Sequence, residues 1–482
     1  MRAPNIRPTS GACAVALVMA LVPMAQASAT APQKINPGLA AEIEAWSHSD
    51  MSSNQWGLEA IRASAAWRTS TGAGTTVAVI DTGLDMTHPD LAGQTVSAGY
   101  VWQVGTENGQ TVGRLRPATA SPGLVQQLDL IGHGTHVAGV IAGNSNARGI
   151  TGVAPGARIL PINLAAALTE STTMSRFATA FTTAIDAAIR DGARVINVSL
   201  GGAELELPWQ ALPRSQKERA ALAASRRICA SIERARMAGV ITVVAAGNSA
   251  HDGNQRSDPG VCPAAIEVGA VGPSLQRAYF SNYNSRVDLT APGAGILSST
   301  PARPDTPSAP GIHGYEWLDG TSFAAPHVSG VLALVLARHP AWNADQVISS
   351  VYASVTDRGI EGTDPEFGRG VVDAAVAVDP DHNTAGGVTA VDAFIPTLRM
   401  ATNDRGEFAF AFNPPSVNHF ADFAVTVVNR NTGSSRTYSL PGDAVSTPAI
   451  PPSSWVRLRA TTTAGRAFDA GWFATPPIAP RG

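Results

Sequence analysis

Charged and aromatic side chains are scarce in this 482-residue chain, at 15% and 6%, and its net charge is only −3. So small a charge argues against a nucleic-acid or anionic-membrane partner. Hydrophobic residues make up 44%, which is enough for one large core and a smaller second domain. The 46 glycines and 34 prolines are ordinary for a loop-rich α/β enzyme and too few for a disordered chain.

Long hydrophobic runs are absent except at the N-terminus, where the residues are arranged as in a secretory signal peptide. Arg2 and Arg7 precede an apolar core, Ala12 to Ala25, and the small residues Ala27-Ser28-Ala29 form a cleavage site. The core is well short of the roughly 20 residues that span a bilayer, which favours a signal peptide over a transmembrane helix. We therefore expect a secreted or periplasmic protein with no membrane span in the mature chain.

Cysteine is limited to three residues, and Cys13 leaves with the signal peptide. Cys229 and Cys262 remain, an even number in an exported protein, which favours a disulfide. Two buried free thiols are the alternative. Without histidines at matching spacing, the two cysteines do not make a zinc site.

Three short motifs carry an acid, a base and a hydroxyl. Asp81 ends an apolar strand in AVIDTG, His133 lies between glycines in GHGTHVAG, and Ser322 stands before an apolar run in DGTSFAAPH. Each alone is also explained by a turn, a helix cap or a metal-binding histidine. Together, in the order Asp, His, Ser, they are the parts of an activated nucleophile.

At these motifs the chain resembles the subtilisin-like serine peptidases, from roughly Gln55 to Val378. The resemblance implies hydrolysis of protein or peptide substrates through an acyl-enzyme, with no cofactor required for the chemistry. Ser322 would be the nucleophile, His133 the general base, and Asp81 the acid that orients the imidazole. Asn248, which ends the apolar segment VVAAGN, matches the asparagine that donates to the oxyanion in the family.

Strand-like and helix-like segments alternate through the same region, which predicts a parallel sheet covered by helices on both faces. With the resemblance, this indicates an α/β, subtilisin-like three-layer fold with a mostly parallel central sheet. The family also implies two walls of a substrate cleft. These are Ser199, Leu200 and Gly201 on one side, and Ala245, Ala246 and Gly247 on the other. Because the residues of the second wall have small or no side chains, we predict a pocket that accommodates a fairly large apolar side chain of the substrate.

Asp90 and Asn146 match positions that bind calcium in calcium-stabilised relatives, and oxygen ligands suit that ion. Arg148 is unfavourable beside a cation, and an N-terminal ligand is missing. A structural calcium ion and a hydrogen-bonded turn both stay open as interpretations.

The chain divides into four predicted parts: 1–29, the signal peptide; 30–54, a short pro-segment or leader; 55–380, the catalytic domain; and 388–482, a small β-rich C-terminal domain. The leader is too short for a folded inhibitory prodomain. Alternation with period two in Glu407 to Phe412 supports the C-terminal assignment. Two polar insertions, Val101 to Gln127 and Glu204 to Arg227, are expected in surface connections.

The favoured function is an exported, monomeric serine endopeptidase. A narrow-specificity processing protease is the main alternative, since the motifs do not separate the two. A peptide-binding protein on an inactive peptidase scaffold is disfavoured, because such a protein would normally have lost a triad residue or Asn248.

Overall fold

The computed structural model describes residues 49–118, 129–168, 174–201, 214–254, 259–301, 314–379, 387–388 and, with gaps, 399–474. The predicted signal peptide and most of the predicted leader lie outside these residues. The domain boundaries at 55, 380 and 388 therefore stay predictions.

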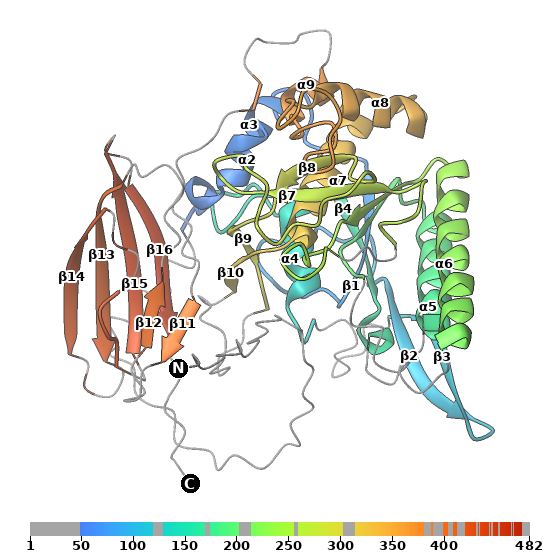
Figure 1. Ribbon diagram of the computed structural model, residues 1–482, viewed down its shortest axis with the longest axis horizontal. Helices are drawn as coiled ribbons and strands as arrows, with labels where there is room; N and C mark the ends of the chain where they lie inside the picture. Colours follow the sequence, from blue (N-terminus) through green and yellow to red (C-terminus); the bar gives the residue numbers. More distant parts are fainter. Residues whose placement is uncertain are drawn as a thin grey trace, which may run out of the picture.

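An eight-stranded sheet with the strand order β3-β2-β4-β1-β5-β6-β7-β8 forms the centre (Figure 1). Its strands are β1 (Thr76–Asp81), β2 (Tyr100–Glu107), β3 (Gln110–Pro117), β4 (Arg158–Asn163), β5 (Val195–Val198), β6 (Ile241–Ala245), β7 (Ile266–Val271) and β8 (Leu289–Pro292). All neighbouring pairs from β2 to β8 are parallel, and β3 alone is antiparallel, in a hairpin with β2. The mostly parallel sheet is confirmed. The polar insertion after Val101 is partly this hairpin, not only a loop.

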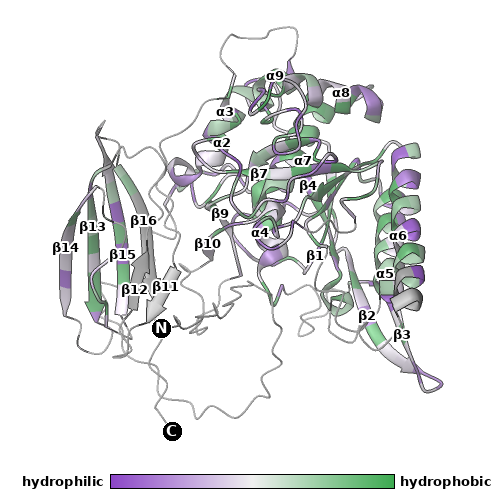
Figure 2. Cartoon of the chain, in the orientation of Figure 1, coloured by the Kyte–Doolittle hydropathy of each residue, from purple (hydrophilic) through white to green (hydrophobic). Residues whose placement is uncertain are grey.

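Helices cover both faces of the sheet because the central strands are apolar on both sides. In β1, Val77 and Val79 join one buried cluster, with α4 (His133–Ala142) and α7 (Thr321–Arg338). Ala78 and Ile80 join the other, with α5 (Met174–Arg190) and α6 (Arg214–Met237). Alternate residues of a strand point to opposite faces, so β1 contributes to both cores. This gives the three layers expected (Figure 2).

Shorter elements complete the catalytic part. They are η1 (Ser52–Asn54), α2 (Trp56–Ala60), α3 (Ala63–Ala66), η2 (Ala165–Ala167), β9 (Ile296–Ser299), β10 (Tyr315–Leu318), α8 (Ala344–Ser354) and α9 (Ala374–Val378). Among the described helices, α7 passes the length and hydropathy criteria for a membrane span, but 83% of that window is buried within the fold. It is the central helix of the first core cluster.

A separate antiparallel sheet lies near the C-terminus, as expected. Its strands, in the order β14-β13-β15-β16, are β13 (Phe420–Asn429), β14 (Ser435–Pro441), β15 (Ser454–Thr462) and β16 (Ala467–Ala474). A two-stranded sheet of β11 (Arg399–Thr402) and β12 (Phe408–Ala411) accompanies it. Phe423, Val456 and Leu458 belong to its own buried cluster, and Trp317 of β10 packs against that cluster. The C-terminal sheet is thereby held against the hairpin that precedes Ser322.

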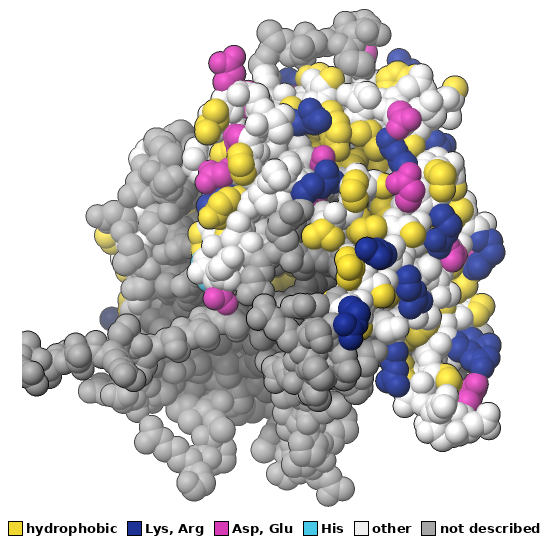
Figure 3. Space-filling view, turned by 45° about the vertical axis from the view of Figure 1, so that its right-hand side comes forward, with side chains coloured by type: hydrophobic (Ala, Val, Ile, Leu, Met, Phe, Trp, Pro, Cys, Tyr) yellow, Lys and Arg dark blue, Asp and Glu magenta, His cyan; other side chains and the backbone are white. Residues whose placement is uncertain are grey.

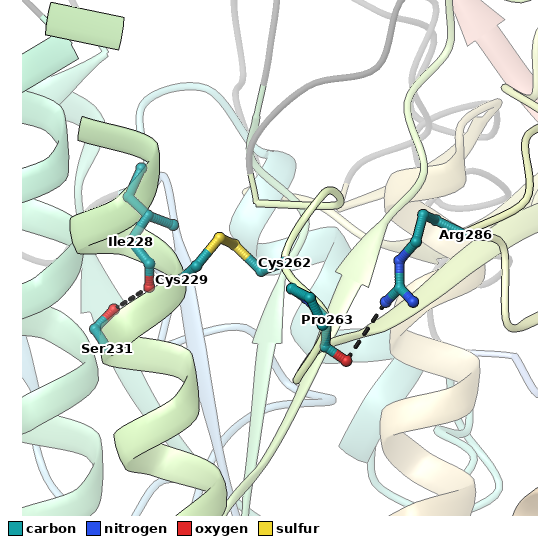
Figure 4. Close-up of a disulfide and its surroundings, with 6 residues drawn as sticks. All are labelled: Ile228, Cys229, Ser231, Cys262, Pro263 and Arg286. Carbon is teal, nitrogen blue, oxygen red and sulfur yellow. Dashed lines mark hydrogen bonds between the residues drawn. A yellow bond between two sulfur atoms is a disulfide. The ribbon is translucent and has the colours of Figure 1, made fainter. Parts of the chain in front are cut away.

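Cys229 of α6 and Cys262, in the loop before β7, form a disulfide with a Cα–Cα distance of 5.0 Å (Figure 4). The predicted pairing is confirmed, and the alternative of two free thiols is wrong. The carbonyl of the next residue, Pro263, accepts a hydrogen bond from Arg286 Nη2 at 3.4 Å. The loop before β7 is thus fixed to α6 by the disulfide and to Arg286 by the hydrogen bond.

The α5–α6 layer presents arginine side chains to solvent (Figure 3). Arg219, Arg226, Arg227 and Arg234 of α6 are all exposed. Arg234 pairs with Asp186 of α5 at 2.8 Å. The insertion that ends at Arg227 is therefore partly helical, and its exposed side is basic although the whole chain is slightly acidic.

Candidate active site

The acid and the base of the three motifs lie side by side. Asp81 is the last residue of β1, at the carboxyl edge of the sheet, and His133 is the first residue of α4. His133 Nδ1 lies 2.8 Å from Asp81 Oδ1. The Asp81 side chain is buried, while the imidazole is 20% exposed. A carboxylate only accepts, so Nδ1 carries the proton, and Nε2 is left to act as a base.

Ser322 stands in the first turn of α7 and faces the end of β5. Its Oγ donates to the carbonyl of Ser199 at 3.1 Å, and Ser199 Oγ donates to the carbonyl of Ser322 at 2.7 Å. The rings of His133 and Phe323, the residue after the serine, lie 5.4 Å apart. Proton transfer to the imidazole requires the hydroxyl hydrogen to turn away from the Ser199 carbonyl.

Asn248 follows β6 and is oriented by Thr321, the residue before Ser322. Asn248 Oδ1 accepts from Thr321 N and from Thr321 Oγ1, both at 2.9 Å. Thr321 Oγ1 in turn accepts from Gly247 N at 3.0 Å. Two donors on Oδ1 fix the orientation of the amide, so its NH₂ group points the other way, toward Gly320. The sequence alone did not indicate a role for Thr321, although its place next to the serine was the available signal.

The NH₂ group of Asn248 and the backbone N–H of Ser322 are donors of the kind that stabilise an oxyanion. The first four N–H groups of a helix have no partner within it, and the helix dipole favours negative charge there. An oxygen atom that becomes negatively charged near Ser322 would accept hydrogen bonds from donors that are already oriented. Preorganised donors of this kind are the main source of oxyanion stabilisation.

The two expected walls of the cleft leave the sheet next to each other, because β5 and β6 pair in parallel with Val198 opposite Val244. Ser199 is buried, Leu200 is half-buried and Gly201 is exposed. Ala246 is buried, and Ala245 and Gly247 are half-buried. Gly247 has a φ of +101°, and a Cβ there would lie 2.4 Å from Asn282 Nδ2, so only glycine suits this position. Substrate contact by these six residues stays a prediction.

Two further histidines near the serine are buried and neutral. Burial lowers the pKa of His136 to about 3 and that of His327 to about 4. His136 Nε2 lies 3.1 Å from the carbonyls of Ile296 and Glu316, and its ring packs 4.4 Å from Phe323. Within the described residues no group of three or more His, Cys, Asp or Glu could hold a metal. His136 therefore packs against Phe323, the residue after the serine, and the metal-binding interpretation has no support among the described residues.

Asp90 and Asn146 are placed differently from each other. Asp90 is fully buried, and its Oδ2 accepts from Ile150 N at 3.0 Å and Ser299 Oγ at 3.2 Å. Its Oδ1 makes no hydrogen bond of normal geometry in the described structure, although the Tyr315 hydroxyl lies beside the carboxyl group. Burial raises the pKa of Asp90. Asn146 is exposed, and its Oδ1 accepts from Arg148 N at 3.0 Å. Asp90 is thus a buried carboxyl group with hydrogen-bond donors around it, whereas Asn146 accepts a hydrogen bond within its own loop. Calcium binding by either residue stays a prediction.

Comparison with known proteins matches this region. Residues 72–370 match the profile of the Subtilase family. Fervidolysin from Fervidobacterium pennivorans is 33% identical over 357 residues, which are 70% of this chain and 46% of that protein. Subtilisin NAT from Bacillus subtilis subsp. natto is 31% identical over 333 residues, 68% of this chain and 72% of that protein. Among solved structures, a protease from Pseudoalteromonas arctica is similar at a TM-score of 0.52 and 29% identity, covering 70% of this chain and 99% of that one.

Proposed function

The chain belongs to the subtilase family, and we propose that it is an exported serine endopeptidase acting on protein substrates. The observation that carries the proposal is the 2.8 Å contact between Asp81 and His133, beside the first turn of the helix that carries Ser322. Export rests on the signal-like N-terminus and on the disulfide between Cys229 and Cys262.

In the proposed reaction, Ser322 Oγ attacks the carbonyl carbon of the scissile peptide bond while His133 Nε2 takes the hydroxyl proton. Asp81 holds the imidazole in the required tautomer and stabilises the imidazolium that forms. The tetrahedral oxyanion accepts hydrogen bonds from Asn248 Nδ2 and Ser322 N. His133 then gives its proton to the leaving amine as the C–N bond breaks, and water, deprotonated by the same base, hydrolyses the acyl-enzyme.

The substrate backbone would run between the Ser199–Gly201 and Ala245–Gly247 segments. Hydrogen bonds to an extended peptide give affinity without a strict sequence requirement. The small side chains of the second segment favour a large apolar residue before the cleaved bond. A second subunit is not needed for any step, so we propose that the enzyme acts as a monomer.

Labelling with a sulfonyl fluoride, mapped by mass spectrometry, tests the nucleophile. We expect one adduct per chain, on Ser322, because its hydroxyl is only half-buried and His133, the proposed base, lies beside the ring of the next residue, Phe323. Ser329 in the same helix is fully buried and serves as an internal control that should stay unlabelled. A folded protein that does not react, or that carries the adduct elsewhere, would contradict the proposed function.

We also propose that Asp90 contributes to a structural calcium site. Because burial raises its folded pKa above 3.8, ionising Asp90 costs folding free energy as the pH rises through that folded value, and a bound cation would offset this cost. We expect EDTA at neutral pH to lower Tm by about 5–10 °C. The variant Asp90→Asn should lose this response.

Asp288→Asn is the matched control for the calcium experiment. Asp288 is another carboxyl group whose pKa is raised by burial, in a different part of the fold. Its variant should keep the full EDTA response. If EDTA left the Tm of the parent protein unchanged, the proposal of a calcium ion at Asp90 would be wrong, and the hydrogen-bonded turn would be the better interpretation.

A further inference from the structure

A buried carboxylate lies between the segments that carry the acid and the base. Asp129, four residues before His133, is 1% exposed. Its Oδ1 accepts from Gly132 N at 2.8 Å and Ile131 N at 3.2 Å, and its Oδ2 accepts from Thr135 N at 2.8 Å. Backbone N–H groups at the start of a helix have no partner within that helix, and this carboxylate satisfies one of them, Thr135 N, together with two N–H groups of the preceding turn. It thereby fixes the turn that brings His133 to the first position of α4.

Thr82 extends the contact to the end of β1. Its Oγ1 donates to Asp129 Oδ1 at 2.8 Å and accepts from Gly134 N at 3.0 Å. The Thr82 N–H donates to Asp81 Oδ1 at 2.7 Å, and this is the oxygen that faces His133 Nδ1. From Asp129, one path of hydrogen bonds therefore leads through Thr82 to the acid, and another leads through the start of α4 to the base. Hydrogen bonds in a buried network of this kind are strong and restrict motion.

The two segments are also packed as closely as glycine allows. A Cβ on Gly134 would lie 2.2 Å from the Gly83 carbonyl oxygen and 3.1 Å from Asp81 Cβ. A Cβ on Gly83, whose φ is +128°, would lie 3.2 Å from Asp129 Cα. A side chain on Gly134 would require the end of β1 and the start of α4 to move apart, and one on Gly83 would collide with Asn163 and crowd Asp129.

We propose that Asp129 is a positioning residue that sets the Asp81–His133 contact, acting through Thr82 and the first turn of α4. The proposal rests on the proposed peptidase function and deepens it. The hydrogen bonds of Asp129 described above, to Thr82 and to the turn before α4 and its start, are those of a buried helix cap. Its effect would come from geometry, because small displacements of a catalytic group reduce the rate steeply.

Asp373 is a buried helix cap for comparison, and its hydrogen bonds described here do not lead to Asp81 or His133. It is fully buried, and its Oδ1 accepts from Ala375 N at 3.0 Å and Val376 N at 3.2 Å at the start of α9. Its Oδ2 accepts from Arg62 Nε at 2.8 Å. The loss of either cap should lower stability. Of the two caps, only Asp129 is connected to the acid and the base, so only its loss should reduce turnover.

The test compares Asp129→Asn, Thr82→Val, their double variant and Asp373→Asn in the full chain. We expect Asp129→Asn and Thr82→Val each to lower kcat for a soluble peptide by about 10- to 100-fold with KM unchanged. The rate of Ser322 labelling by the sulfonyl fluoride should fall by a similar factor, because it reports the same base. The double variant should lose less than the product of the two single effects, since both residues act through one network. Asp373→Asn should lower Tm and keep the parental kcat.

Two results would overturn the proposal. In the first, Asp129→Asn loses as much Tm as Asp373→Asn but keeps its kcat, which makes Asp129 a structural cap only. The second result concerns the case in which Asp129→Asn does not fold. The near-isosteric variant Thr82→Val is then measured instead, and it folds and keeps the parental kcat. Either result leaves the peptidase function standing, since the parent protein still hydrolyses and is labelled. If the parent protein neither hydrolysed the peptide nor reacted with the sulfonyl fluoride, the peptidase function and the positioning role would both be contradicted.

Discussion

Replacing Ser322 by alanine is expected to lower kcat by about 10⁶-fold, the size of the loss when the nucleophile of subtilisin is removed. In the proposed mechanism Ser322 is the only one of the three motif residues that forms a bond to the substrate, so no acyl-enzyme would form without it. KM should change little, because the pairing of β5 with β6 holds the Ser199–Gly201 and Ala245–Gly247 segments in place without the hydroxyl. Steady-state hydrolysis of a chromogenic peptide measures both constants.

Ser329→Ala is the matched control for that experiment. Ser329 lies in the same helix and is fully buried, and its Oγ donates to Asn197 Oδ1 at 2.9 Å. Its loss should lower Tm and leave kcat nearly unchanged. If Ser322→Ala kept more than about a thousandth of the parental kcat, which is far above the residual rate that binding and oxyanion donors alone support, Ser322 would not be the nucleophile.

Replacing Asn248 by leucine is expected to lower kcat by about 10²- to 10³-fold with little change in KM. Leucine keeps the approximate shape but removes the NH₂ donor, which is needed only when the oxyanion forms. Thr321→Val should have a smaller effect, about 10-fold, because it removes one of the two hydrogen bonds that orient the amide. Separate measurement of kcat and KM distinguishes the mechanisms. An increase in KM at constant kcat would assign Asn248 to binding of the ground state.

The fold was predictable where sequence patterns are local and strong. The apolar strands β1, β5 and β6 and the long helix α7 follow the alternation of strand-like and helix-like segments that the sequence predicts. The β2–β3 hairpin was missed because its strands are mostly exposed and polar, so they carry little hydrophobic periodicity. The basic side of α6 was not predicted, because the net charge is a sum over the whole chain and does not show where charged residues cluster.

By itself the sequence determined which residues are the candidates for the acid, the base, the hydroxyl and the oxyanion amide. Each stands at the end of an apolar strand or the start of a helix, and each is surrounded by residues whose local conformation is restricted. Only the tertiary structure decided how these groups are held. Thr82 meets Asp129 across 47 positions, and Thr321 meets Asn248 across 73. Such contacts depend on the direction of side chains over distances of about 3 Å, which spacing along the chain does not encode.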